Sequence, residues 1–169
     1  MSNTTNSWPS GKKWILAVVG ALLLVVIWWA FRPEKLWINT RVNEPAPSSS
    51  STNSQPLFTG SLASRAHPTS GRASVYQSAD GKRDLRLTDF MTSNGPDVRV
   101  LLAQSTDENL KQTFLKGELK SIELGPLKAN QGDQNYELPD STDLSRYDAV
   151  VIYCVRFHVV FGVAKLDKF

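Results

Sequence analysis

The sequence predicts a mainly β protein: an antiparallel β-sandwich of about eight strands, preceded by one N-terminal transmembrane helix. Three observations lead to this prediction. One long, uninterrupted apolar run lies near the N-terminus. Behind it, short segments of alternating apolar and polar residues are separated by turn residues at a spacing of roughly ten residues, which is typical of sandwiches. The longest apolar run of this second part, residues 148–164, is rich in β-branched and aromatic residues, which favour a strand over a helix.

The N-terminal apolar run, from Trp14 to Phe31, contains eighteen consecutive uncharged residues between two basic ones. As a helix it would measure about 27 Å, close to the roughly 30 Å hydrocarbon core of a bilayer. Tryptophans lie at both of its ends, as in the interfacial belts of membrane helices. We therefore expect a transmembrane helix over residues 12–32 that contacts the lipid bilayer through residues 14–31.

A cleaved signal peptide is the alternative to a permanent anchor. Cleavage sites carry small residues at two positions separated by one residue, but here Trp28 precedes Ala30 at that distance. Basic residues flank the run on both sides, so their distribution leaves the orientation open. The short polar tail in front and the long domain behind favour an uncleaved signal anchor, crossing the membrane once, with the C-terminal domain outside.

Composition divides the chain into four parts. Residues 1–11 are rich in Ser, Thr and Asn and are expected to be disordered, and residues 12–32 form the anchor. Residues 33–56 combine a juxtamembrane segment with a Ser/Pro-rich stretch, which is typical of a flexible linker. The sandwich domain is expected over residues 57–169, which are long enough to bury a core.

Charge and cysteine content limit the function classes. Residues 1–56 contain five basic and two acidic residues, whereas residues 57–169 contain fourteen of each. The basic excess therefore lies beside the apolar run, and nucleic-acid binding loses its electrostatic support. Cys154 is the only cysteine, so the domain has no internal disulfide and depends on its core for stability.

Turn residues separate the expected strands. Ala79-Asp-Gly81 is a strong hairpin signal, and a second turn is expected over 93–97. Residues 130–135 are expected to form a loop and residues 143–147 a one-turn helix, whereas 104–118 fit a short helix or a loose hairpin excursion equally well. The strands expected before the long apolar run are Phe58–Ala63, Arg72–Gln77, Arg83–Phe90, Val98–Ala103, Ile122–Leu124 and Tyr136–Leu138.

The long apolar run, residues 148–164, is predicted to be the central strand of the core. Its seventeen residues exceed one ordinary strand. No turn residue interrupts them before Gly162. We therefore expect a bend or bulge near Phe157-His158 that lets the chain pass from one sheet region to another.

Cys154 is the first candidate for chemistry. Strand alternation places it on one face with Val150, Ile152 and Arg156, the last about 7 Å along the strand. In one interpretation it is a small buried hydrophobic residue, which is a common place for a free cysteine. In the other it is a redox thiol or a ligand, with Arg156 able to lower its pKa.

The two histidines add little to a nucleophilic or metal site. His158 falls on the face of Cys154 but about 13 Å along the strand. His67 lies in a loop whose position relative to Cys154 is open. No acyl-transfer motif accompanies these residues, and no metal site is predicted from their spacing. Haem ligation by Cys154 or His67 is a hypothesis that lacks the usual attachment motif, so the cofactor is left unknown.

Several segments in their order resemble one family, the DM-thirteen domain or electron-transfer DM domain. This domain occurs beside DOMON domains in Skeletor-type proteins and alone behind a membrane anchor in bacteria. The resemblance covers nearly all of residues 58–166. It rests on Thr69-Ser-Gly71 with Ala73 and Val75-Tyr76, Leu85–Phe90, Thr92–Val98, Leu124–Lys128, Asn130–Tyr136, Asp143–Tyr147, Ile152-Tyr-Cys154, Phe157, Phe161-Gly162 and Ala164. Tyr153 stands where the family often has Trp, and residues 104–118 are longer than usual.

The resemblance implies a β-sandwich and places Cys154 at the family's characteristic cysteine. It implies electron transfer through a bare thiol or a bound prosthetic group, in a bacterial cytoplasmic membrane protein with an unidentified redox or other protein partner outside the cytoplasm. The chain is not expected to be an enzyme in its own right. The alternative is a non-catalytic extracytoplasmic module that binds a protein or ligand and in which Cys154 is structural.

Overall fold

The computed structural model describes residues 10–31, 38–47, 55–104 and 120–169. The chain separates into two compact units, residues 1–34 and residues 35–169. The first contains the helix α1, Ser10–Phe31, which is uninterrupted because the segment lacks proline and is dominated by Leu, Val and Ala. Within α1, residues Lys12–Trp29 are long and apolar enough to cross a membrane.

The predicted N-terminal helix is thus confirmed, and it begins at Ser10, two residues before the expected start of the anchor. The remainder of the tail that was expected to be disordered, residues 1–9, lies outside the described residues.

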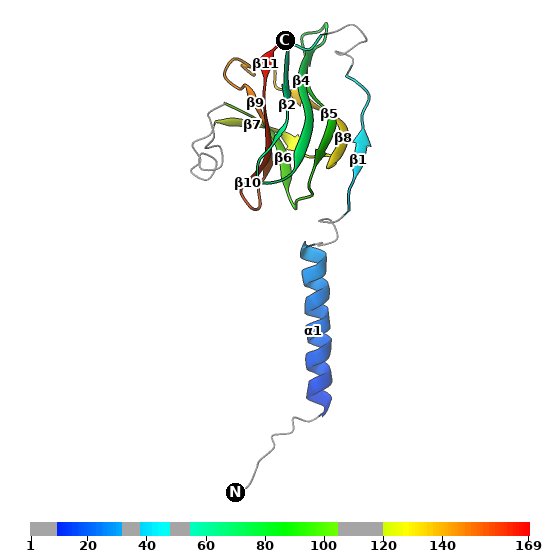
Figure 1. The fold of residues 1–169 in the computed structure, drawn as a ribbon. Coiled ribbons are helices and arrows are strands. Elements are labelled where there is room, and N and C mark those ends of the chain that lie inside the picture. Colours follow the sequence, from blue (N-terminus) through cyan, green and yellow to red (C-terminus); the bar gives the residue numbers. More distant parts are fainter. Residues whose placement is uncertain (1–9, 32–37, 48–54, 105–119) are drawn as a thin grey trace. The chain divides into compact units, whose positions relative to one another are not determined.

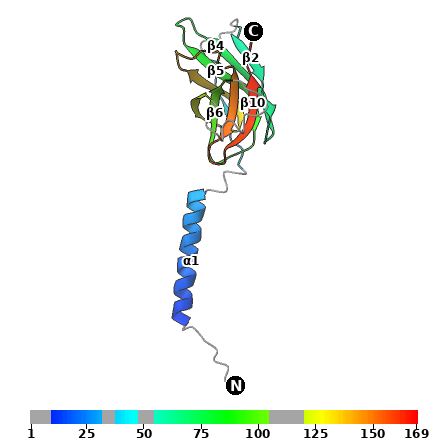
Figure 2. The same cartoon turned by 90° about the vertical axis from the view of Figure 1, so that its left-hand side faces the viewer.

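The second unit is a β-sandwich of two sheets, as Figures 1 and 2 show. The first sheet has the strand order β1-β8-β5-β4-β2-β11 and the second the order β3-β10-β9-β6-β7. The strands of the first sheet are β1 Arg41–Asn43, β2 Phe58–Ser61, β4 Thr69–Gln77, β5 Arg83–Thr92, β8 Gln131–Leu138 and β11 Asp167–Lys168. Those of the second are β3 Ala63–Ser64, β6 Val98–Ala103, β7 Ser121–Pro126, β9 Ala149–Cys154 and β10 Val159–Lys165.

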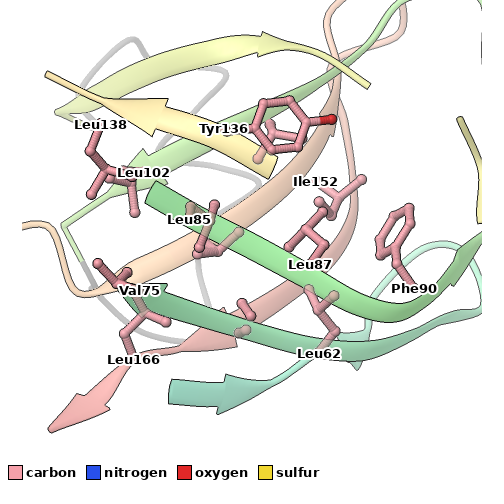
Figure 3. Close-up of a cluster of buried hydrophobic side chains, with 14 of the residues drawn as sticks. Leu62, Val75, Leu85, Leu87, Phe90, Leu102, Tyr136, Leu138, Ile152 and Leu166 are labelled. Atoms are coloured by element: carbon pink, nitrogen blue, oxygen red, sulfur yellow. The ribbon is translucent and has the colours of Figure 1, made fainter. Parts of the chain in front are cut away.

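The core lies between the sheets, where the longer strands bury alternate side chains on their inner faces. Figure 3 shows these side chains between the two sheets, among them Leu85 and Leu87 of β5 and Ile152 of β9. The predicted sandwich is therefore confirmed. It has eleven strands among the described residues rather than about eight, because short strands at the sheet edges add to the predicted ones.

Several elements match the sequence prediction closely. The strand β6 has the predicted bounds. The hairpin between β4 and β5 turns at Asp80-Gly81, where the Gly81 N–H donates to the Ser78 carbonyl at 2.9 Å. Glycine suits this position because its φ is 89°. The expected one-turn helix over residues 143–147 is a hydrogen-bonded turn, in which the Tyr147 N–H donates to the Asp143 carbonyl at 2.9 Å.

The prediction of a loop over residues 130–135 is wrong, because residues 131–135 belong to β8. The segment is polar, which is unusual for a strand in the interior of a sheet. It is stable there because β8 pairs with β5 along its length and with β1 over Gln131–Asp133, so its backbone groups are satisfied. Its polar side chains also find partners, as described below.

The long apolar run contains the break expected near residues 157–158, but its consequence was predicted wrongly. Residues 155–158 form a turn, and β10 returns antiparallel to β9 within the same sheet. The turn is anchored by the Val155 N–H, which donates to the Asp97 carbonyl at 2.9 Å. The strand β9 lies at the centre of the five-stranded sheet, as predicted.

The segment before residue 57 differs from the predicted linker. Arg41–Asn43 form β1, which pairs in parallel with β8 at the edge of the first sheet, as Figure 1 shows. Residues 38–47 therefore belong with the sandwich, because their backbone and side chains bond to it. Residues 48–54 lie outside the described residues, as does most of the excursion expected over 104–118.

Candidate functional site

Cys154 is the last residue of β9 and lies between the two neighbouring strands of its sheet. Its register partners are Val98 of β6 and Val159 of β10. The side chain is fully buried in the core between the sheets, together with Val150 and Ile152 of the same strand. The predicted face is therefore correct for these three residues, and it is an interior face.

Phe161 connects this part of the core to His67. Phe161 lies at a bulge of β10 and belongs to the same buried cluster as Cys154. The ring of His67, in the loop before β4, stacks on the Phe161 ring at a centroid distance of 3.9 Å. His67 Nδ1 lies 3.2 Å from the Ser93 hydroxyl, which fixes the orientation of the imidazole. The loop of His67 thus closes over the aromatic residue next to the core.

The structure corrects the positions of Arg156 and His158 relative to Cys154. Arg156 is exposed in the turn, so it does not share the buried face of Cys154. His158 is the last residue of the turn, and its side chain lies toward the opposite face of β9. There its Nδ1 lies 2.9 Å from the hydroxyl of Tyr153. Strand alternation predicted that Arg156 and His158 share the face of Cys154, and this is wrong because the strand ends at Cys154.

The pair of Tyr153 and His158 was missed in the sequence. Tyr153 is buried in a second cluster on the outer face of the second sheet. Burial is the main cause that raises the pKa of Tyr153, so the phenol is neutral at physiological pH. His158 has a φ of 52°, a conformation that few residues other than glycine adopt. The available signal was a Tyr at the end of the first part of the apolar run followed five residues later by a His.

Polar residues of the stretch 130–136 form a second group of interacting side chains. Gln134 is fully buried, donates to the Ala129 carbonyl at 2.7 Å and accepts from the Lys128 and Ala129 N–H groups. The Tyr136 hydroxyl donates to Gln134 Oε1 at 2.9 Å. Burial raises the pKa of Tyr136 to about 12. These bonds fix the short chain between β7 and β8, which is a structural role.

Ionic contacts hold the segment after β1 against the first sheet. Lys128 Nζ bonds both Glu44 carboxylate oxygens, at 2.7 and 2.9 Å. Arg86, which is largely buried, pairs with Asp133 at 2.7 Å and donates to the carbonyls of Glu44 and Pro45. We call Glu44, Arg86, Lys128 and Asp133 the latch. Burial would raise the pKa of Glu44, but the bonds from Lys128 and the Asn135 N–H outweigh it and lower the pKa.

Comparison with known proteins decides the family. A family model described as "Electron transfer DM13" matches residues 61–166, which is more than half of the chain. The chain belongs to the DM13 family. The resemblance expected from the sequence is therefore confirmed, and the matched range contains Cys154, His67 and the Tyr153–His158 pair. No curated protein and no solved structure matches the chain.

A prosthetic group on Cys154 does not fit the packing of this DM13 domain. The residue is enclosed by core side chains and has no exposed surface. A surface cavity of about 400 Å³ lies elsewhere and does not reach it. Its lining residues are Glu123, Leu124, Glu137, Leu138, Pro139 and Asp140. Within the described ranges, no group of three or more His, Cys, Asp or Glu residues is placed to hold a metal ion.

Proposed function

We propose that this DM13 protein is a membrane-anchored electron-transfer module whose domain lies outside the cytoplasm and whose redox centre includes Cys154. The observation that carries the proposal is the family match, which spans the sandwich from residue 61 to residue 166. The helix α1 supports the anchor, because it is long and apolar enough to cross a membrane. We place the N-terminal boundary of the sandwich domain near residue 38, because β1, Arg41–Asn43, pairs with β8.

The burial of Cys154 limits the kind of chemistry that this module performs. A fully buried thiol does not meet a substrate or a partner thiol without local unfolding, so disulfide exchange is not supported. Transfer of an electron requires no such contact, because electrons cross short distances through packed protein. The proposal is therefore electron exchange with a docked redox partner rather than thiol chemistry on a substrate.

A second candidate function follows from the same burial. The register partners of Cys154, Val98 and Val159, are aliphatic and its cluster is hydrophobic, and a free cysteine in such surroundings commonly acts as a small hydrophobic residue. In this alternative the domain is an extracytoplasmic binding module and Cys154 contributes only packing.

The test uses the purified full chain in detergent. Its absorption spectrum reveals any haem directly, and thiol titration with and without denaturant measures the accessibility of Cys154. A reductive and oxidative titration of the wild type and of Cys154→Ala then follows. The proposal requires a reversible redox signal that Cys154→Ala loses while remaining folded. A colourless chain whose redox behaviour is unchanged by Cys154→Ala would support the binding module instead.

A further inference from the structure

The hydrogen bond between Tyr153 and His158 joins a buried phenol to an exposed base. The Tyr153 hydroxyl lies 2.9 Å from His158 Nδ1, and the two ring centroids lie 6.4 Å apart. Tyr153 is 6% exposed, whereas His158 is an exposed residue of the turn. The contact thus leads from the interior of the second sheet to the surface of the domain.

We propose that Tyr153 and His158 form a proton-coupled redox pair through which the domain exchanges electrons with its partner. This inference rests on the proposed electron-transfer function and names the residues that would carry it. It also explains how an electron could pass between the buried Cys154 and the surface. Tyr153 is adjacent to Cys154 in β9 and is bonded to the exposed His158.

The chemical step is a one-electron oxidation of the phenol. The Tyr153 O–H bond breaks, its proton forms a new N–H bond at His158 Nδ1, and the electron passes to a one-electron oxidant on the docked partner. The products are a neutral tyrosyl radical, an imidazolium and the reduced oxidant. A one-electron reductant reverses the step, and the proton returns to the phenol oxygen. The step requires neutral His158 with its proton on Nε2.

The base is what distinguishes this tyrosine from an equally buried one. Tyr136 is 5% exposed, but its hydroxyl bonds the amide oxygen of Gln134, which does not take up a proton at physiological pH. The Lys128 ammonium also lies 5.2 Å from the centre of the Tyr136 ring. A positive charge at this place opposes removal of an electron from the ring. Tyr136 therefore lacks the base that Tyr153 has, and its neighbouring cation opposes oxidation.

The surroundings of Tyr153 suit a radical. Among the described residues, the other members of its buried cluster are aliphatic, namely Leu101, Ala103, Ala149, Val151, Val160 and Val163. The burial of the ring keeps the radical away from tyrosines of other molecules, with which exposed tyrosyl radicals couple. The left-handed conformation of His158 aims its imidazole back at the strand, and such strain occurs often at functional sites.

The experiment generates the oxidant by light in the presence of the full chain in lipid nanodiscs. Flash-produced tris(bipyridine)ruthenium(III) serves as the one-electron oxidant, and electron paramagnetic resonance detects the radical. Growth on ring-deuterated tyrosine narrows a tyrosyl signal and leaves signals of the five tryptophans unchanged. We expect a tyrosyl radical in the wild type that Tyr153→Phe abolishes and Tyr136→Phe retains.

His158→Asn is the second variant, because asparagine tolerates the left-handed backbone but is not a base. We expect the radical yield to fall by about tenfold or more, the scale of losing a strong hydrogen bond. Unfolding midpoints show whether each variant is folded, and His158→Asn decides the question if Tyr153→Phe is not. An unchanged radical in a folded Tyr153→Phe or His158→Asn variant overturns the inference.

The outcome is separable from that of the proposed function. Loss of the Cys154-dependent signal in the Cys154→Ala titration concerns Cys154 alone, whereas the flash experiment concerns Tyr153 with Cys154 intact. If the redox signal depends on Cys154 but Tyr153→Phe leaves the radical yield unchanged, the proposed function stands and the Tyr153–His158 pair is refuted. A Tyr153 radical in a chain without any Cys154-dependent signal refutes the thiol centre and retains the pair.

Discussion

Cys154 is fully buried in a hydrophobic cluster, so we expect polar replacements there to destabilise the domain. Serine is smaller than cysteine and carries a hydroxyl that needs a partner. We expect Cys154→Ser to be less stable than Cys154→Ala by about 1–3 kcal/mol, because the hydroxyl is buried without compensation. Denaturant unfolding of both variants measures the difference. Equal or greater stability of the serine variant would reveal a polar partner at this site.

Glu44 makes the contribution of the latch to the stability of the fold depend on pH. Its pKa in the folded chain lies below the ordinary value of 4.5, so its ionised form stabilises the fold. This stabilisation is present above pH 4.5 and is lost as the pH falls through the lowered folded pKa. We expect Glu44→Gln to cost about 1 kcal/mol near neutral pH, a modest value because 27% of the side chain is exposed.

The measurement for Glu44 is the unfolding free energy of the wild type and the variant across the acid range. The two curves should converge below the folded pKa of Glu44, where the wild-type carboxyl is protonated as well. Glu137→Gln, which alters an exposed carboxylate of β8, is the control and should cost less. A difference between wild type and Glu44→Gln that persists unchanged into acid would contradict the linkage.

At the scale of single residues, the sequence identified the burial of Cys154 as one of two alternatives but misplaced its neighbours. The interior face of β9 followed from alternation, because Val150 and Ile152 are aliphatic on the same parity. The positions of Arg156 and His158 did not follow, because parity holds only while a strand continues. Where an apolar segment turns is decided by tertiary contacts, such as the bond from Val155 to Asp97.

Among the elements, β8 depends most on its neighbours. Its polar sequence predicts a loop by local propensity, and only pairing with β5 and β1 makes it a strand. No local pattern predicts that Gln134 is fully buried, because its partners are backbone groups of the preceding turn and the hydroxyl of Tyr136, which become available only in the folded domain. By contrast, β6 was predicted correctly, because its apolar residues and the turn before it are local signals.

Gly132 permits the pairing of β1 with β8. Its φ is 96°, and a Cβ atom there would collide with the Val42 carbonyl oxygen. We expect Gly132→Ala to destabilise the domain by about 1–3 kcal/mol and to displace β1. Gly125→Ala is the matched control, since Gly125 also has a positive φ but has open space around its missing Cβ.

Amide hydrogen exchange reports on β1 directly. The Glu44 N–H donates to the Asp133 carbonyl at 3.0 Å in the wild type. Its exchange should accelerate in Gly132→Ala and remain near the wild-type rate in Gly125→Ala. Equal effects of the two substitutions on stability and on the Glu44 amide would show that backbone strain alone, and not the contact with β1, sets the cost.

For the whole molecule, the sequence predicted the division into an apolar helix and a β-sandwich, because hydropathy and strand alternation are strong signals. The boundary between the helix and the sandwich was harder to predict from the sequence. Residues 38–47 have the composition of a linker, and their place beside β8 depends on contacts with residues about ninety positions later, such as those of Thr40 and Glu44.

The distinction between an anchor and a cleaved signal is testable on the whole chain. We expect the expressed protein to remain in the membrane fraction after carbonate extraction, with its N-terminal residues intact by mass spectrometry. Deletion of residues 1–34 should release the remainder into the soluble fraction. A mature chain that begins after residue 31 would identify α1 as a signal sequence, and protease protection in sealed vesicles reports the side on which the domain lies.

The pairing of β1 also bears on self-association. An unpaired strand at the edge of a sheet is a template for a strand of another molecule and so for aggregation. In the DM13 domain, the chain's own segment Arg41–Asn43 occupies the edge of β8 over Gln131–Asp133. By pairing with β8, this three-residue strand occupies backbone groups that a strand of another molecule would otherwise pair with, and so opposes aggregation through this edge.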